Sequence, residues 1–552
     1  MPAVPGTSAR RPVWSEPDLE SWGLHRLVFR RRLPFLVLAC ALVAATTLRV
    51  VGVAEKHSLT GDESISYLAA ACHQGDYTRL AIAQQPPFGR WVTAAEWKAL
   101  LRPDRAMCLG EIRHELARTD IHPPLYFWLL HGWALVFGVG LWTGPSLNIA
   151  IAGLTTLVLF GFARRVIGQP LLAAGVAATW SFSPAAIRVF AEARQYELLA
   201  LIAVLFLWQC VRFCAPPTDT PSRDGLLLAA TVAAGALTQI LFALVAVTGL
   251  GLFVVRLWGA DRRLLASGLA SLAAGYASFA LLHPGFVASL RRGREQAVAS
   301  ATDRLGRRTE RSIDTIAEFL LPPKLADGAL AYLVAAMFVG AAAWLAVWAL
   351  RTRGRPLRRC PTLIPVISFL WLLAAHMVLY VSFLAPRHAM SFKYLSVIWP
   401  FAAFVPVLAL SVLPRLARRV VTPLLGVALI VCGSIAALGL FPNPRPQRAI
   451  EHAPHLVVDN VARRVLPRIV WRVPDRTLVF AADQSYLLAH QQDWLARLGP
   501  GAVISSYPRI VSYPPSGNTP HGQRRLLKVV MLRKGLIRRG QHLWSIPADV
   551  DR

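Results

Sequence analysis

The strongest constraint on this chain is a series of apolar runs, many of them bordered by arginines. The first run, LPFLVLACALVAATTLRVVGVA, occupies residues 33 to 54 and follows three consecutive arginines. A helix needs about 20 predominantly apolar residues to cross the hydrocarbon core of a bilayer. Because such a helix satisfies all its own backbone hydrogen bonds, it is one of the few structures that can span lipid. The runs therefore predict transmembrane helices.

Composition supports a membrane protein. Hydrophobic residues make up 55% of the 552 residues and charged residues only 16%, whereas soluble proteins have about 25% charged residues. The net charge of +29 would ordinarily suggest a nucleic-acid-binding protein. Here, however, the basic residues form short clusters at the ends of apolar runs, which is the positive-inside pattern of membrane proteins. We therefore expect no nucleic-acid partner.

The arginine clusters predict a topology in which residues 1 to 32 form a cytoplasmic N-terminal tail. We expect an all-α polytopic membrane protein with about 11 transmembrane helices. The predicted spans are 33–54, 145–163, 170–188, 197–213, two short spans within 226–256, 265–284, 329–350, 361–384, 394–413 and 420–440. One alternative stays open, because a single span in 226–256 would reverse the orientation of every later helix.

Soluble segments are predicted on the outer face. The transmembrane domain, residues 33 to 441, includes an outer loop at 55 to 144, in which HPPLYFWLLHGWALVFG is expected to lie along the membrane surface. Residues 442 to 552 are predicted to form a small extracytoplasmic α/β domain. The indications are a strand and helix in RTLVFAADQSYLLAHQQDWLARL and further strands in LLKVVML and HLWSI.

Acidic residues with a chemical role are predicted directly after the first span, in TGDESISYLAA. Asp62 and Glu63 are adjacent carboxylates at the membrane surface, where acidic groups are costly unless they have a partner or a task. Partial burial and a neighbouring carboxylate both raise a carboxyl pKa toward the working pH of a general base. The alternative is a helix N-terminus in which Asp62 is the N-cap and Glu63 lies in the first turn, where its charge suits the helix dipole.

Two other segments predicted on the outer face combine cations with aromatic residues. They are RVFAEARQYELL, with Glu192, Arg194 and Tyr196, and APRHAMSFKYL, with Arg387, His388, Lys393 and Tyr394. Cations on the outer side run against the positive-inside trend, and guanidinium and ammonium groups suit a phosphate. Ordinary interfacial anchoring is the alternative. His122, in HPPLY, is a candidate for orienting a substrate or ligating a metal. The basic segment 291–311 indicates either a binding site for an anionic carrier or glycan or an amphipathic helix that lies on anionic lipid headgroups.

Cys72 and Cys108 both lie in the first outer loop. The outer compartment permits disulfides, so a bridge between them is predicted.

Together these motifs resemble the GT-C integral membrane glycosyltransferases. GDESISYLA, HPPLYFWLLHGWALVFG, FSPAAIRVFAEARQYELL and PRHAMSFKYL are most similar to the family 39-like group, which includes protein O-mannosyltransferases and lipid A aminoarabinose transferases. The resemblance implies a GT-C-like fold and a hexosyl or pentosyl transferase of the bacterial plasma membrane. It covers roughly residues 33 to 400.

The resemblance also implies an activity. A sugar would move from a polyprenyl-phosphate donor to an acceptor hydroxyl on the outer face, with inversion. Asp62 would be the base, Glu63 would support it, and Glu192 would occupy the place of a second acidic residue. Arg194, Arg387 and Lys393 would hold the carrier phosphate. The acceptor is a lipid, a glycan or a protein, membrane lipids surround the chain, and a divalent cation is an open question. The alternatives are a flippase for lipid-linked sugars and a glycan ligase that uses the same carriers.

Overall fold

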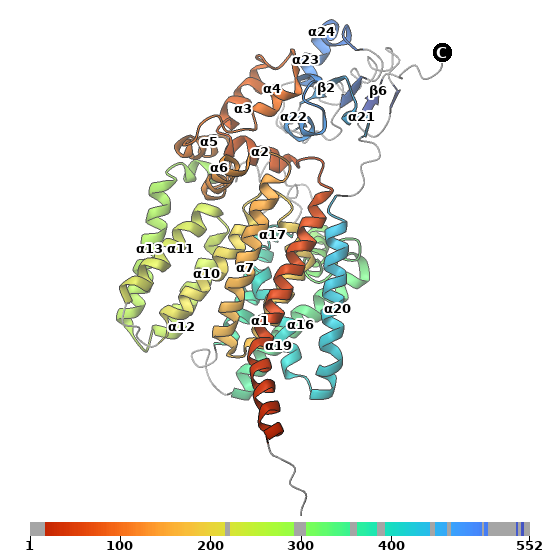
Figure 1. Ribbon diagram of the computed structural model, residues 1–552. Helices are drawn as coiled ribbons and strands as arrows, with labels where there is room; N and C mark the ends of the chain where they lie inside the picture. The colour runs from red at the N-terminus through yellow and green to blue at the C-terminus, as the bar shows by residue number, and fades with distance from the viewer. Residues whose placement is uncertain are drawn as a thin grey trace, which may run out of the picture.

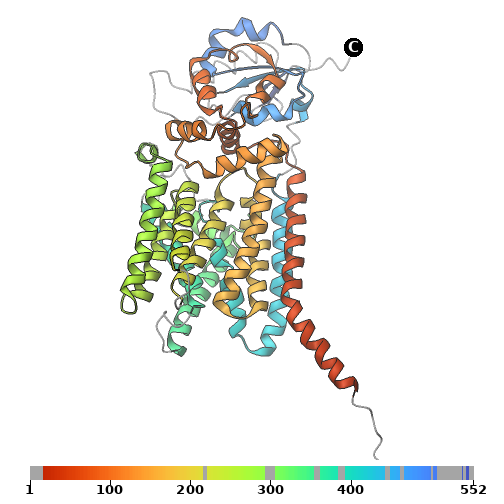
Figure 2. The ribbon, with the colours of Figure 1, turned by 60° about the vertical axis from the view of Figure 1, so that its left-hand side comes forward.

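The computed structural model describes residues 17–215, 221–291, 305–353, 361–382, 392–441, 448–460, 465–498, 502–505, 537–538 and 543–545. In these residues a bundle of long helices carries a smaller, mixed α/β part at one end (Figures 1 and 2). The bundle consists of α1 (Pro17–Ala54), α7 (Thr143–Ile167), α8 (Pro170–Phe182), α9 (Pro184–Val189), α10 (Tyr196–Phe213), α11 (Pro221–Thr238), α12 (Phe242–Leu257), α13 (Arg262–Leu282), α15 (Leu305–Ala317), α16 (Gly328–Arg353), α17 (Leu363–Ser382), α18 (Trp399–Ala402), α19 (Phe404–Val412) and α20 (Arg415–Leu438).

Seven helices in the described residues are long and apolar enough to cross a membrane: α1 from Arg32, α7, α10, α13, α16, α17 and α20. The other segments predicted as spans are also helical, but they are shorter or more polar. Residues 170 to 188 divide into α8 and α9, because Ser183 adopts an extended conformation and caps α9, which begins at Pro184. The protein is a multi-pass membrane protein, and within the described residues shorter apolar helices, among them α8 and α12, accompany the seven long ones.

The ambiguous stretch 226–256 contains two helices. Helix α11 ends at Thr238 and α12 begins at Phe242, with a turn between them in which the backbone N–H of Phe242 donates to the carbonyl of Gln239. Helix α11 packs against α13 and α10, and α12 also packs against α10. The alternative with one helix in this stretch is therefore wrong, and the predicted pair of short helices is confirmed.

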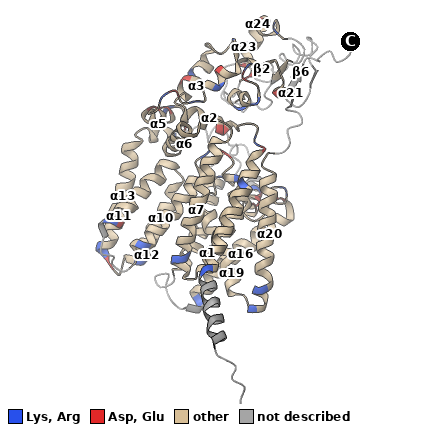
Figure 3. Ribbon diagram, in the orientation of Figure 1, with Lys and Arg blue, Asp and Glu red and all other residues tan. Residues whose placement is uncertain are grey.

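The two ends of the bundle differ in charge. Figure 3 shows Lys and Arg gathered at the end away from the α/β part. We call this the basic end and the opposite end the site end. The arginines of the basic end include Arg164 and Arg165 of α7, Arg256 of α12, Arg262 and Arg263 of α13, and Arg415, Arg418 and Arg419 of α20.

Short helices at the site end come from the first loop. They are α2 (Gly61–Ala70), α3 (Gln74–Ala83), α4 (Ala94–Ala99), α5 (Leu109–Thr119) and α6 (Leu125–Phe137). Helix α6 is apolar but has only 13 residues, which is shorter than the length of about 17 to 25 residues that a spanning helix needs. It packs against α2 and α7 near the top of the bundle in Figure 1.

The α/β part contains a six-stranded sheet in the order β1-β3-β2-β4-β6-β5. The strands are β1 (Trp91–Thr93), β2 (His455–Asp459), β3 (Leu478–Ala482), β4 (Val503–Ser505), β5 (Ile537–Arg538) and β6 (Leu543–Ser545), and the short helices beside them are α21 (Arg448–Glu451), α22 (Val465–Ile469), η3 (Val470–Arg472), α23 (Gln484–Ala489) and α24 (Gln491–Leu495). The predicted strands at RTLVFAAD and HLWSI correspond to β3 and β6, whereas LLKVVML lies outside the described residues.

One strand of this sheet comes from the first loop. Strand β1 pairs antiparallel with β3, so that Trp91 lies opposite Phe480, while β3, β2 and β4 run parallel to one another. Lys98, after β1, donates to Asp475 at 2.7 Å. The first loop and the C-terminal region thus share one sheet, so these two segments are joined by backbone hydrogen bonds.

Candidate functional site

Helix α2 begins the site, and its start is fixed locally. The Thr60 side chain accepts from the backbone N–H of Glu63, and the Glu63 carboxylate accepts from the backbone N–H of Thr60 at 2.7 Å. This reciprocal arrangement is a capping box, and two acids in the first turn also suit the helix dipole. The N-cap is thus Thr60 and not Asp62, so the predicted cap residue is wrong, whereas Glu63 lies in the first turn as predicted. Asp62, next to it, is partly exposed.

Glu63 is completely buried and ties three segments together. Its carboxylate pairs with Lys56, which follows α1, and accepts from the backbone N–H of Ala193 at 2.9 Å. Lys56 also donates to the carbonyl of Ala191 at 2.8 Å. A buried carboxylate is stable only when its charge is paired and its oxygens accept hydrogen bonds. Glu63 therefore holds the segment that carries Glu192 and Arg194 against α2.

The segment between α9 and α10, residues 190 to 195, is held from a second side by α7. Asn148 donates to the carbonyls of Phe190 at 3.0 Å and Glu192 at 2.6 Å, and its own amide oxygen accepts from the hydroxyl of Tyr126 at 3.1 Å. These contacts satisfy backbone carbonyls that would otherwise be unpaired in a buried segment. They also fix the direction in which the Arg194 side chain leaves the backbone.

Arg194 is the central cation of the site. Only 4% of the residue is exposed. Its Nη1 donates to the carbonyl of Asp62 and to the hydroxyl of Ser66, at 3.3 and 3.2 Å, and Nη2 donates to Nε2 of His122 at 3.0 Å. Burial alone would lower the pKa of Arg194, but nearby acidic groups, Asp62 above all, raise it above its usual value. Arg194 therefore stays charged beside Asp62.

His122 links Arg194 to an acidic residue that the sequence analysis missed. Because a guanidinium can only donate, Nε2 of His122 must accept, and the ring proton lies on Nδ1. That nitrogen lies 2.6 Å from Oδ1 of Asp120. Burial opposes the charge of Asp120, but His122 and Arg194 outweigh burial and hold its pKa well below the ordinary value of 3.8. The result is a chain of contacts from Asp120 through His122 to Arg194.

Lys393 and Glu192 form an ion pair, in which each side chain is about one-fifth exposed. Beside them, the rings of Tyr196 and Tyr394 meet edge to face, with centroids 5.9 Å apart. The structure thus brings together Asp62, His122, Glu192, Arg194, Tyr196, Lys393 and Tyr394 at the site end. Arg387 and His388 lie outside the described residues.

Arg188, the first residue of the segment RVFAEARQYELL, pairs with a residue outside the group just described. Its Nη1 lies 2.7 Å from Oε2 of Glu318, and its guanidinium carbon lies 3.8 Å from the centroid of the Phe392 ring. The charge of Arg188 is therefore paired, and one face of its guanidinium packs on Phe392, the residue next to Lys393.

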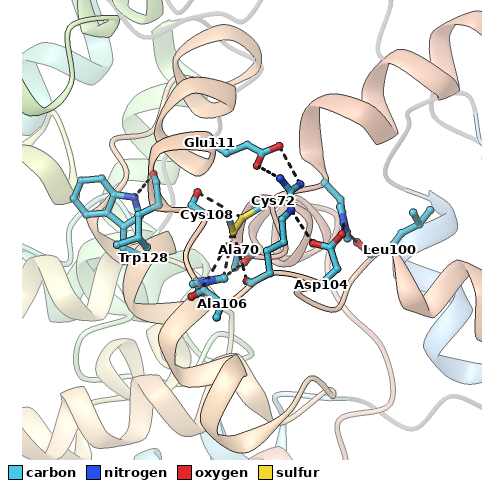
Figure 4. Close-up of a disulfide and its surroundings, with 12 residues drawn as sticks. Ala70, Cys72, Leu100, Asp104, Ala106, Cys108, Glu111 and Trp128 are labelled. Carbon is cyan, nitrogen blue, oxygen red and sulfur yellow. Dashed lines mark hydrogen bonds and ion pairs between the residues drawn. A yellow bond between two sulfur atoms is a disulfide. The ribbon is translucent and has the colours of Figure 1, made fainter.

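Cys72 and Cys108 are joined by a disulfide that connects the end of α2 to the start of α5 (Figure 4). His131 lies beside it, with Nδ1 2.7 Å from the carbonyl of Ala70 and Nε2 3.2 Å from the carbonyl of Ala106. These two cysteines and His131 form the one group of three metal-capable side chains found in the described residues. Since both sulfurs are in the disulfide, this group does not fit a cation.

Sequence reasoning missed Lys56, Asp120, Asn148 and Ser66. The sequence contained a hint of Asp120, because it stands two residues before His122 in TDIHPP. It also contained a hint of Lys56, because lysine is rare in this chain. Asn148 and Ser66 had none, since their partners lie in segments that are distant in sequence.

Comparison with known proteins identifies the fold. Residues 121 to 287 match the model of the dolichyl-phosphate-mannose-protein mannosyltransferase family. The structure is similar to that of ArnT from Cupriavidus metallidurans bound to undecaprenyl phosphate, with a TM-score of 0.53 and 16% identity over 93% of this chain and 97% of that chain. It is also similar to the same protein in the apo state, with a TM-score of 0.51 and 14% identity over 96% and 98% of the two chains.

No curated protein matches the chain significantly by sequence. The structural likeness extends over almost the whole length of both chains, and it confirms the GT-C-like fold that the motifs predicted.

Proposed function

We propose that this protein transfers a sugar from a polyprenyl-phosphate donor to an acceptor hydroxyl at the site end, on the outer face of a bacterial plasma membrane. The observation that carries the proposal is the position of Asp62, a partly exposed acid, beside the buried guanidinium of Arg194, whose Nη1 donates to the backbone carbonyl of Asp62 at 3.3 Å. The family model matched by residues 121 to 287 and the ArnT structure bound to undecaprenyl phosphate support the same donor class.

The reaction is a single displacement. Asp62 accepts the proton of the acceptor hydroxyl, whose oxygen attacks the anomeric carbon of the sugar. The bond between that carbon and the phosphate oxygen breaks, and the bonding electrons leave with the polyprenyl phosphate. Attack on the face opposite the leaving group inverts the anomeric configuration.

Cations of the site oppose the charge that builds on the leaving phosphate. We assign this role to Arg194 and Lys393, because charge-assisted hydrogen bonds from fixed donors are strongest where charge develops. Nε of Arg194 is buried and has no hydrogen-bond partner among the described residues, so one N–H of this guanidinium is unsatisfied within the protein. Glu192 holds Lys393 in place before the donor arrives. No step of this mechanism uses a metal ion.

The test is an assay of the purified protein in lipid with a radiolabelled polyprenyl-phosphate sugar and lipid, glycan and protein acceptors. Asp62→Asn is expected to lower the transfer rate by about 10²- to 10⁴-fold, the usual contribution of a general base. Asp76→Asn is the matched control, because Asp76 lies in the same loop on α3 and pairs with Arg79 at an exposed position.

Full transfer by Asp62→Asn would exclude Asp62 as the base. Movement of intact sugar-lipid across the bilayer, with its sugar–phosphate bond unbroken, would instead indicate the flippase. A product that carries a whole glycan chain would indicate the ligase.

A further inference from the structure

A basic cavity lies at the opposite end of the bundle from the proposed site. It has a volume of about 250 Å³ and is lined by Arg165, Trp208, Arg212 and Ala215. Arg165 belongs to the last turn of α7, and Trp208 and Arg212 belong to the last turns of α10. These two helices pack against each other, and their basic ends lie near the bottom of the bundle in Figures 1 and 3.

The position of Trp208 depends on a glycine. A Cβ atom built on Gly161 of α7 would lie 2.6 Å from Cη2 of Trp208. Only a residue without a side chain therefore allows the indole ring to lie against α7. Trp208 and Arg212 are four residues apart on α10, so their side chains share one face of the helix. The ring and the guanidinium are thus presented to the same cavity.

The two arginines of the cavity are held differently. Nη2 of Arg212 donates to Oδ1 of Asp224 on α11 at 3.0 Å, which fixes the guanidinium and leaves its other N–H groups available. The side chain of Arg165 is exposed and makes no hydrogen bond or ion pair with any residue that the structure describes. Two cations against one carboxylate leave the cavity with a net positive charge.

These features match the headgroup of an anionic lipid. Guanidinium groups bind phosphate oxygens through paired N–H donors, and tryptophan favours the headgroup level of a membrane. Basic pockets between helices at the cytoplasmic side bind anionic lipid headgroups, and the positive-inside rule assigns the basic end to that side. We propose that this cavity binds the phosphate group of an anionic phospholipid of the leaflet at the basic end.

The test measures lipid binding to the purified full-length protein by native mass spectrometry, with phosphatidylglycerol as the probe and phosphatidylcholine as the uncharged comparison. Arg165→Gln is expected to weaken phosphatidylglycerol binding about fivefold, the effect of one cation near an anionic surface. Arg164→Gln is the matched control. It removes the same charge from the neighbouring exposed position, which does not line the cavity, and binding is expected to stay within about twofold of the wild-type value.

Two further variants separate the cavity from general charge. Trp208→Leu keeps every charge and is expected to weaken binding through loss of the ring. The pair Arg212→Gln with Asp224→Asn removes the second cation together with the buried carboxylate that it contacts. Equal losses in Arg164→Gln and Arg165→Gln would overturn the proposal, as would equal binding of phosphatidylcholine. If millimolar inorganic phosphate displaced all the bound phosphatidylglycerol, the cavity would be assigned to free phosphate instead of lipid. None of these variants touches the proposed transfer site, so the result is independent of the transfer assay.

Discussion

At the residue scale, the site depends on how Arg194 is held. Its two terminal nitrogens contact His122, Ser66 and the carbonyl of Asp62. A lysine has a single nitrogen and lacks the planar fork of donors, so it is a poor substitute where several directions are used at once. The positive charge itself is only part of what Arg194 supplies.

Arg194→Lys therefore tests geometry separately from charge. We expect the transfer rate to fall by about tenfold or more, because one ammonium group cannot keep all three contacts and still reach a phosphate. The measurement is the initial rate of transfer at saturating donor. Arg79→Lys, at an exposed pair with Asp76, is expected to keep the wild-type rate. An unchanged rate in Arg194→Lys would mean that charge alone suffices.

Asp120 gives a prediction about stability and pH. Its folded pKa lies below the ordinary value of 3.8, so its carboxylate contributes stability at every pH above about 3.8. This contribution is lost as the pH falls from that value through the folded pKa. Asp120→Asn should thus lower the unfolding temperature at neutral pH, and the difference from the wild-type protein should shrink only below about pH 4. A difference that disappears already between pH 7 and pH 5 would contradict the assignment.

At the element scale, the site exists because α2 and the segment at 190–195 are fastened together. Glu63 completes the capping box of α2 by accepting from Thr60 and also accepts from Ala193, while Lys56 pairs with Glu63 and donates to Ala191. The local part of this arrangement, a capping box in TGDE, is readable from the sequence. The long-range part is not, because Ala191 and Ala193 contribute only backbone groups, which carry no sequence signal.

A double-mutant cycle on Lys56 and Glu63 tests this fastening. Lys56→Met or Glu63→Gln alone leaves a buried charge unpaired and should cost about 3 to 5 kcal/mol. The double variant should cost less than the sum of the two single variants, because neither charge remains. The measurement is the unfolding temperature of each purified variant. Additive losses would show that the pair does not interact energetically.

At the scale of the whole molecule, the two ends of the bundle differ in their content of basic residues. The basic end carries arginines of α7, α12, α13 and α20, while the α/β part lies at the other end (Figure 2). The positive-inside rule therefore predicts that the α/β part and the proposed transfer site lie on the outer face of the membrane.

Cysteine labelling in intact cells tests this orientation. Gln491→Cys in α24 places a thiol in the α/β part, and Arg418→Cys in α20 places one at the basic end. A membrane-impermeant maleimide is expected to label the first variant and to label the second only after the membrane is opened. The reverse pattern would overturn both the orientation and the proposed outer-face site.

Much of the fold could be predicted because its determinants are local. Hydropathy identified the long helices, and the arginine clusters predicted which end of each helix faces the cytoplasm. The break between α11 and α12 was left open, since 226–256 is a nearly continuous apolar stretch. Four of the predicted spans correspond to helices that are shorter or more polar than the seven long ones. Hydropathy does not locate a break such as the one at Ser183, which divides one of them into α8 and α9.

For this protein the sequence by itself determined the membrane class, the polarity of the bundle and most residues of the candidate site, since each rests on composition or on a short motif. Only the tertiary structure decided that β1 joins the sheet of the C-terminal region, that Glu63 is a buried tether beside the partly exposed Asp62, and that Asp120 and His122 hold Arg194. The physical reason is distance along the chain. Each of these decisions, apart from the local contact of Asp120 with His122, depends on a hydrogen bond or ion pair between segments that meet only when the bundle closes.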